Sequence, residues 1–281
     1  MQILQTPAEM QEHARALKRS GRVIGLVPTM GFLHAGHVSL MRLARAQCDE
    51  LVVSLFVNPP QFGPAEDLDA YPRDFKQDEA LCRQAGVDAV FYPKAADMYA
   101  ADASVWIDED VLSGGLCGAA RPGHFRGVCT VVAKLFNLVL PDLAVFGEKD
   151  AQQLRIIERM VRDLNFPVQV VRGPMVREPD GLAMSSRNKY LSERQRKDAL
   201  VLRQALDHAG QLVGQGERCV RVVRDAMIAM IEKIPGTAVD YIELVDDQSL
   251  APVDRVERAV LVAVAVKIGA IRLIDNDVLN V

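Results

Sequence analysis

The chain has 281 residues, 49% of them hydrophobic and 25% charged, which is ordinary for a folded protein with a sizeable core. The formal net charge of −4 excludes a global basic field that would attract nucleic acid, so we expect any anion binding to be local. Five scattered cysteines without a C-x-x-C pair favour reduced, packing residues of a cytoplasmic protein over a zinc site.

The sequence is not typical of a membrane or export protein. The N-terminus lacks a basic and then apolar signal pattern, and the most apolar run, 259–266, is too short to span a bilayer. We therefore expect a soluble protein with small-molecule ligands and with no nucleic-acid or membrane partner.

Strands and helices alternate over the first 171 residues. Thr6-Pro7-Ala8-Glu9 is a capping box that predicts a helix to about Arg19. Continuous apolar runs separated by helices predict a parallel sheet that is covered on both faces. We expect strands at 23–27, 51–57, 89–92, 143–146 and 168–171, and helices near 38–47, 75–85, 125–138 and 152–164.

The pattern changes in the last third of the chain. Gly173, Pro174 and Pro179 predict a hinge. Beyond it, two long amphipathic helices (192–213 and 220–234) precede three strand-like segments (239–244, 256–266 and 271–274). Helices followed by strands indicate a separate α+β unit, so we divide the chain into domains at 1–175 and 176–281.

The most informative stretch joins the first apolar strand of the sheet to a helix. Gly31 and Gly36 allow tight turns, and His34 and His37 lie three apart, on one face of the first helical turn. Free N–H groups and the helix dipole favour an anion there, so the pair predicts a phosphate site without a glycine-rich P-loop. Alternatively, the histidines bind a metal or are ordinary polar residues at a helix start.

Two other strand ends carry polar groups. Asn58 and Gln61 lie in a loop stiffened by Pro59 and Pro60, where their amides can hydrogen-bond a small substrate, although Asn-Pro is also a common turn opener. Lys149 begins a helix, where its charge would act with the helix dipole on a phosphate; the alternative is an exposed charge.

Two further loops are basic. Residues 118–127 form a glycine-dense loop with Arg121, His124 and Arg126, which is either a mobile flap over a phosphate or a solvated loop. The run 184–188 combines two serine hydroxyls, backbone N–H groups and a guanidinium, a set that suits polyphosphate oxygens but is weak evidence alone.

Together these motifs resemble the pantoate–β-alanine ligase (pantothenate synthetase) family of the HIGH-motif nucleotidylyl transferase superfamily. The resemblance covers essentially the whole chain, without a departure at a motif position. The motifs in order are P-T-M-G-F-L-H-A-G-H, F-V-N-P-P-Q-F, Y-P-R, R-P-G-H-F, F-G-E-K-D-A-Q-Q and D-G-L-A-M-S-S-R-N-K-Y-L.

The resemblance implies an α/β fold, with a Rossmann-like doubly wound parallel sheet, a smaller α+β C-terminal lid domain and a homodimer. It also implies that ATP and Mg²⁺ convert pantoate to pantoyl adenylate with release of pyrophosphate, after which β-alanine attacks to give pantothenate and AMP. The histidine pair corresponds to the superfamily's H-I-G-H motif, and His37 matches the position assigned as proton donor.

The resemblance also implies site residues. The ATP site falls on Pro28, Thr29, Met30, Gly31, Phe32, Leu33, His34, Ala35, Gly36, His37, Gly147, Glu148, Lys149, Asp150, Val176, Met184, Ser185, Ser186 and Arg187. Pantoate and β-alanine fall on Gln61 and Gln153, with Asn58 and Arg121 as further candidates. Asp78 and Gln77 are candidate Mg²⁺ ligands, although a solvated helix face also explains them.

The residue chemistry agrees with adenylation. The protein must position the reactants and neutralise charge on the departing pyrophosphate. Six residues supply donors and positive charge for this: His34, His37, Lys149, Ser185, Ser186 and Arg187. Two alternatives remain, namely an adenylyltransferase that acts on a phosphorylated acceptor and a nucleotide-binding regulatory module. The first would need more cations in its pocket, and the second predicts a damaged phosphate site.

Overall fold

The computed structural model describes residues 1–64 and 66–280, which form two compact units. The first unit comprises Met1–Ser113 and Arg121–Pro174. The second comprises the chain from Met175 on, together with Gly114–Ala120, although both neighbours of that short segment belong to the first unit. The division after Pro174 lies within the glycine- and proline-rich stretch.

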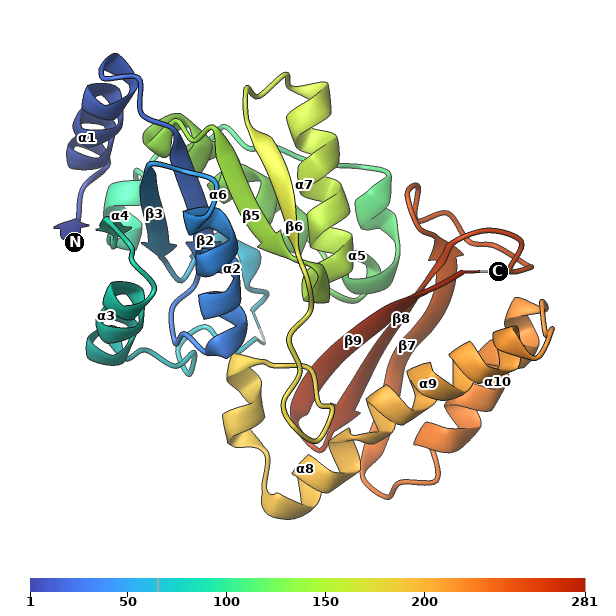
Figure 1. Cartoon of the computed structure of the whole chain (residues 1–281). Coiled ribbons are helices and arrows are strands. Elements are labelled where there is room, and N and C mark those ends of the chain that lie inside the picture. The colour runs from blue at the N-terminus through green and yellow to red at the C-terminus, as the bar shows by residue number, and fades with distance from the viewer. Residues whose placement is uncertain (65, 281) are drawn as a thin grey trace. The chain divides into compact units, whose positions relative to one another are not determined.

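The first unit contains a six-stranded parallel sheet with the strand order β1-β4-β3-β2-β5-β6 (Figure 1). The central strands are built from β-branched and other apolar residues and are almost entirely buried, as expected for a sheet covered on both faces. The strands are β1 (Gln2–Leu4), β2 (Ile24–Thr29), β3 (Glu50–Leu55), β4 (Ala89–Phe91), β5 (Leu143–Gly147) and β6 (Gln169–Gly173).

Helices cover both faces of this sheet. On one face, Val27, Val53 and Val145 pack against Met41 of α2 and Cys82 of α3. The helix α6 is apolar nearly all round and contacts β2, α1 and α7. The helices are α1 (Pro7–Arg19), α2 (Ala35–Arg45), α3 (Phe75–Gln84), α4 (Ala95–Met98), α6 (His124–Val139) and α7 (Ala151–Asp163), with short 3₁₀ turns at Pro59–Gln61, Leu112–Gly114 and Glu148–Asp150.

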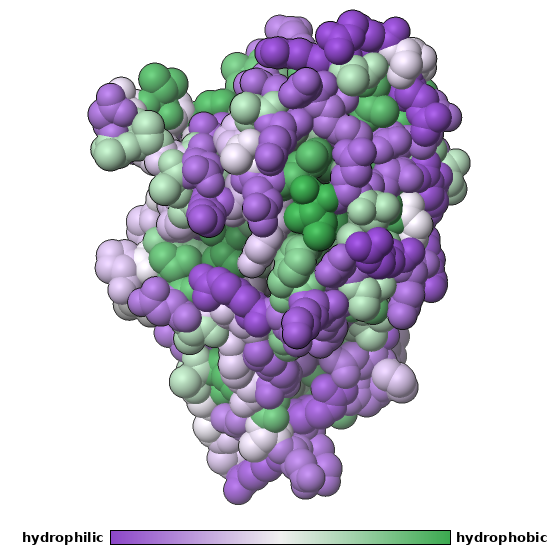
Figure 2. All heavy atoms as spheres, turned by 90° about the vertical axis from the view of Figure 1, so that its left-hand side faces the viewer, coloured by the Kyte–Doolittle hydropathy of each residue, from purple (hydrophilic) through white to green (hydrophobic). Residues whose placement is uncertain are grey.

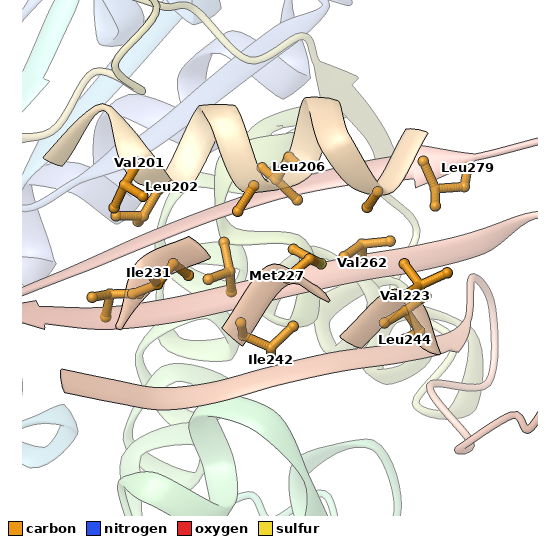
Figure 3. Close-up of a cluster of buried hydrophobic side chains, with 14 of the residues drawn as sticks. Val201, Leu202, Leu206, Val223, Met227, Ile231, Ile242, Leu244, Val262 and Leu279 are labelled. Atoms are coloured by element: carbon orange, nitrogen blue, oxygen red, sulfur yellow. The ribbon is translucent and has the colours of Figure 1, made fainter. Parts of the chain in front are cut away.

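The second unit packs helices against a three-stranded antiparallel sheet of order β7-β8-β9. Figure 3 shows its core, where Leu206 of α9 and Met227 of α10 point toward Ile242 and Val262 of the sheet. The elements are α5 (Leu116–Ala120), a 3₁₀ turn (Ser186–Tyr190), α8 (Glu193–Ala199), α9 (Val201–Gly214), α10 (Val220–Ile231), β7 (Thr237–Asp246), β8 (Val260–Ile268) and β9 (Ile271–Leu279).

The expected α/β fold class is confirmed, and three of the differences in detail have a simple physical reason. The strand β1 was not expected, because three residues at a sheet edge carry no periodic pattern; it pairs with β4. The expected helix 192–213 is two helices that meet at Leu200. The break was not predicted because the apolar pattern continues across it. The expected strand 271–274 extends to Leu279 because β9 pairs with β8 along its full length.

No helix in the described part of the chain is long and apolar enough to cross a membrane. The face of the molecule in Figure 2 is mainly hydrophilic, with hydrophobic residues lying between polar ones.

Candidate functional site

The loop between β2 and α2 turns through two consecutive left-handed residues. Gly31 has φ +81° and Phe32 has φ +50°, a conformation that is uncommon for a residue with a side chain. The backbone N–H groups of Phe32 and Leu33 donate to the Asp78 carboxylate over 2.8 and 2.7 Å. Successive N–H groups in such a turn form an anion-binding concavity, and the buried Asp78 side chain occupies it and holds the turn.

The side chains of the two histidines accept backbone N–H groups at the start of α2 and so cap the helix. The N–H of Gly36 donates to His34 Nδ1 over 3.2 Å, and the N–H of His34 donates to His37 Nδ1 over 3.3 Å. The ring centroids are 4.0 Å apart. Because each Nδ1 accepts a hydrogen bond, the neutral form of each ring carries its proton on Nε2. Both imidazoles therefore have a donor N–H at the ring position farthest from the backbone.

His37 is held in its neutral form. Burial lowers its pKa well below the usual 6.5, and the neighbouring charges of His34 and Lys149 lower the pKa further. Lys149 reaches this region from the 3₁₀ turn that follows β5. A cation, a helix N-terminus and two imidazole donors gathered in this way favour a phosphate group. This arrangement does not favour the metal-pair alternative for the histidines. Each Nδ1 lone pair accepts a backbone N–H and each Nε2 carries the proton, so neither ring offers a free lone pair to a metal ion.

Gln61 lies in a short turn after β3 and is buried. The Asn58 amide donates to Gln61 Oε1 over 3.2 Å and to the carbonyl of Gly127 over 3.1 Å, while Asn58 Oδ1 accepts from the Tyr99 hydroxyl over 2.7 Å. Both amide hydrogens of Asn58 are therefore donated within the protein, and Asn58 holds the Gln61 side chain in place. The Gln61 amide donates to the Met30 thioether over 3.1 Å, a weak acceptor.

Arg121 is paired within the first unit. Its guanidinium Nε and Nη2 donate to the two carboxylate oxygens of Glu66, both over 2.6 Å. Arg126, five positions along the loop, lies over the Trp106 ring and is half-exposed. The pair with Glu66 therefore holds the Arg121 side chain against the first unit.

The two glutamines that begin α7 have different environments. Gln152 is buried, and its amide donates to the carbonyl of Leu112 over 2.8 Å. Gln153 is only partly buried, and among the described residues no hydrogen bond engages its amide. Gln153 is therefore the one suited to an added ligand.

The serine-rich loop belongs to the second unit. The N–H of Met184 donates to the carbonyl of Val176 over 3.1 Å, which brings these two predicted nucleotide residues together. Ser185 Oγ accepts from the N–H of Arg187 over 3.3 Å and so caps the 3₁₀ turn. Just before the loop, Arg177 makes two hydrogen bonds to the buried carboxylate of Asp275.

The structure gives one of the two candidate metal ligands, Asp78, a role in the histidine loop. Both Asp78 oxygens accept backbone N–H groups of the histidine loop, and the N–H of Gln77 is bound by Asp74 in the N-cap of α3. Across residues 1–64 and 66–280, no three His, Cys, Asp or Glu residues gather in a way that could hold a metal ion. The Asp78 carboxylate therefore supports the histidine loop, and the assignment of Asp78 and Gln77 to Mg²⁺ stays a prediction.

Sequence reasoning did not predict several supporting contacts. Asp78, Tyr99, His124 and Gly127 all contact the predicted site residues from elements distant in sequence. Asp78 carried a signal as a candidate metal ligand, and His124 and Gly127 did so as part of the basic stretch, but the partner of each was not deducible from spacing.

Comparison with known proteins agrees with this geometry. A family model described as pantoate-beta-alanine ligase matches residues 2–278. A pantothenate synthetase of Thermotoga neapolitana is 52% identical over 280 residues, covering 100% of both chains. One of Geobacter sulfurreducens is also 52% identical over 280 residues, covering 100% of this chain and 99% of the relative.

Two solved structures extend the likeness to the fold. Pantothenate synthetase from Thermus thermophilus superimposes with a TM-score of 0.93 at 46% identity, covering 99% of each chain. Pantoate-beta-alanine ligase from Francisella tularensis, complexed with beta-gamma ATP and beta-alanine, gives a TM-score of 0.83 at 30% identity. That comparison covers 99% of this chain and 97% of the other.

Proposed function

The chain belongs to the pantoate–β-alanine ligase family, and on this premise we propose that it joins pantoate to β-alanine at the expense of ATP. Pantoyl adenylate forms first with release of pyrophosphate, and β-alanine then displaces AMP to give pantothenate. The observation that carries the proposal is the start of α2, where two Nε2–H imidazoles lie beside Lys149.

The nucleotide phosphates bind at this helix start in our proposal. In the first unit, the histidine loop and residues 147–150 are the phosphate-binding residues of our proposal. In the second unit, the proposed nucleotide-binding residues are Val176 and the residues from Met184 to Arg187. The imidazoles and Lys149 stabilise charge that grows on the departing pyrophosphate, where positioned donors contribute most to the rate. His37 acts by donating a hydrogen bond from Nε2, because its lowered pKa leaves no imidazolium proton to give near neutral pH.

Pantoate binds through neutral amides. Its carboxylate is the nucleophile and needs no base, so the protein's task is to aim it at the α-phosphorus. Gln61 and Gln153 suit this task because, in the described chain, their amide N–H groups make no hydrogen bond to a strong protein acceptor. A guanidinium clamp would stabilise the ground-state carboxylate and reduce its nucleophilicity. Arg121 provides no such clamp, since it is paired with Glu66.

The second step needs protection from water. A neutral amine of β-alanine attacks the acyl carbon of the mixed anhydride, and AMP leaves. We assign the second unit the role of a lid that excludes water while the anhydride exists. Ser185, Ser186 and Arg187 bind phosphate oxygens from that unit.

Magnesium enters as part of the substrate, MgATP. Mg²⁺ is commonly held by substrate phosphates and retained water, with few protein ligands, which suits a described chain lacking a cluster of acidic ligands. We also propose a cytoplasmic homodimer, as the family resemblance implies. Light scattering on the purified protein tests the dimer, and a monomer mass would remove that part of the proposal.

A release assay tests the function. Purified protein is mixed with MgATP and pantoate, and pyrophosphate is measured with and without β-alanine. We expect about one equivalent of pyrophosphate per enzyme without β-alanine, followed by turnover and AMP formation when it is added. ATP binding without pantoate-dependent pyrophosphate release would overturn the ligase proposal and favour the regulatory alternative. Turnover with a phosphorylated acceptor in place of pantoate would favour the adenylyltransferase.

A further inference from the structure

Arg121, just before α6, and His124, the first residue of α6, both contact the backbone carbonyl of Gln61. Nδ1 of His124 lies 2.9 Å from the Gln61 carbonyl oxygen, and a guanidinium nitrogen of Arg121 lies 3.3 Å from the same oxygen. We infer that His124 is a positioning residue for pantoate, which acts by fixing the Gln61 peptide. The inference rests on the proposed function, because it takes Gln61 as a pantoate contact.

The tautomer of His124 follows from its neighbours. A carbonyl oxygen only accepts, so Nδ1 must carry the proton that it donates to Gln61. Arg121 has only donors, so the Arg121 nitrogen 3.1 Å from His124 Nε2 must donate to it. The neutral ring is the only form that satisfies both contacts. Burial, followed by the charge of Arg121, lowers the pKa of His124 to about 4, so the ring keeps this form near neutral pH.

The orientation is fixed from the far side of the ring. Glu66 holds the Arg121 guanidinium through two hydrogen bonds, and Arg121 in turn holds His124 Nε2. The result is a chain from Glu66 through Arg121 and His124 to the Gln61 carbonyl. Glu66, Arg121 and His124 can therefore fix the position of Gln61 without touching the substrate themselves.

Close packing makes Gln61 sensitive to this chain. A Cβ atom at Gly127, in the first turn of α6, would lie 2.6 Å from the Gln61 nitrogen and from the Pro60 carbonyl. The helix backbone therefore lies directly against the turn, and Asn58 binds the Gln61 side chain from a third direction. Loss of the His124 donor leaves a buried carbonyl with one weaker bond and lets the Gln61 amide shift.

Two substitutions separate the two nitrogens of the ring. In His124→Asn the side-chain amide nitrogen takes the place of Nδ1 and can still donate to Gln61. In His124→Gln the amide group takes the place of Nε2, so the contact with Arg121 survives and the donor to Gln61 is lost. Arg126→Ala is the matched control, because Arg126 shares the first turn of α6 but contacts Asp108 and Trp106.

The readout is the KM for pantoate against that for ATP, with the thermal midpoint recorded for each variant. We expect His124→Gln to raise the pantoate KM about tenfold, which corresponds to the loss of one buried hydrogen bond. The ATP KM should stay within about twofold of the wild-type value. His124→Asn should stay within about threefold of the wild type for both substrates, and Arg126→Ala should be unchanged.

Equal pantoate KM values for His124→Gln, His124→Asn and Arg126→Ala would overturn the inference. So would parallel changes for both substrates that follow the thermal midpoint, since they indicate a purely structural role. A wild-type enzyme without pantoate-dependent activity would instead overturn the proposed function, so the two failures are distinguishable. If His124→Gln does not fold, Gly127→Ala tests the same displacement of Gln61 from the opposite side and should also raise the pantoate KM selectively.

Discussion

The backbone N–H of His34 donates to Nδ1 of His37 over 3.3 Å, so the cap of α2 and the choice of tautomer are the same interaction. His37 is thereby kept as an Nε2–H donor, and burial lowers its pKa so that it stays neutral. A neutral imidazole donor avoids the desolvation cost of a buried imidazolium before the nucleotide arrives.

The first prediction separates the ring nitrogens of His37. In His37→Gln the amide nitrogen takes the position of Nε2 and can still donate to a phosphate, whereas the shorter side chain of His37→Asn reaches only Nδ1. We expect His37→Asn to lower kcat by about 10²–10³, the usual loss for a donor that acts on developing charge. His37→Gln should retain more of the rate. Pantoate-dependent pyrophosphate release measures both, and equal losses would contradict the donor role.

The second prediction concerns the influence of Lys149 on His37. The positive charge of Lys149 disfavours the imidazolium, so its removal in Lys149→Met should raise the pKa of His37. The pKa should remain below 6.5, because burial is the larger cause. Lys149→Arg keeps the charge and is the control. An NMR titration of the imidazole signals measures the pKa, and an unchanged value in Lys149→Met would show that the two groups are not coupled.

The third prediction is an acid-dependent loss of stability at His124. Its pKa is about 4 in the folded state against 6.5 for an ordinary histidine, so the unfolded chain binds the extra proton first. The stability contribution is therefore fully present above pH 6.5 and is lost as the pH falls toward 4, by roughly 3 kcal/mol. His124→Asn lacks the titrating group and should lose that much less between pH 7 and pH 4.

Trp106 makes this measurement specific. It is the chain's single tryptophan and lies in the first unit, so its fluorescence in a denaturant titration reports unfolding of that unit. Identical pH dependence in the wild type and His124→Asn would contradict the lowered pKa.

The fourth prediction tests the support of the histidine loop. In Asp78→Asn an amide N–H replaces one acceptor oxygen and faces a backbone N–H of Phe32 or Leu33. We expect a loss of about 2 kcal/mol in the unfolding free energy of the first unit, the cost of a buried unsatisfied donor, together with a higher KM for ATP. Asp74→Asn is the control, because asparagine caps a helix as well as aspartate does. Equal stability of the two variants would show that Asp78 does not hold the turn.

Local patterns in the sequence predicted most of the fold. The apolar runs located five of the six parallel strands, and the Thr6 capping box located the start of α1 at Pro7. The spacing of His34 and His37 predicted a shared face at a helix start, because residues three apart in a helix are neighbours wherever the helix lies.

Long-range partners were beyond such patterns. Asp78 was only a candidate metal ligand or part of a solvated helix face in the sequence, and nothing there indicated that its carboxylate binds N–H groups 45 and 46 residues away. Likewise His124 contacts the carbonyl of Gln61, which lies 63 positions earlier. Periodicity and capping depend on atoms within a few residues, so the sequence alone specifies most of the elements and the histidine pair. Which side chain satisfies a buried N–H or carbonyl depends on how distant elements pack, and only the folded chain brings Asp78 to the histidine loop and His124 to Gln61.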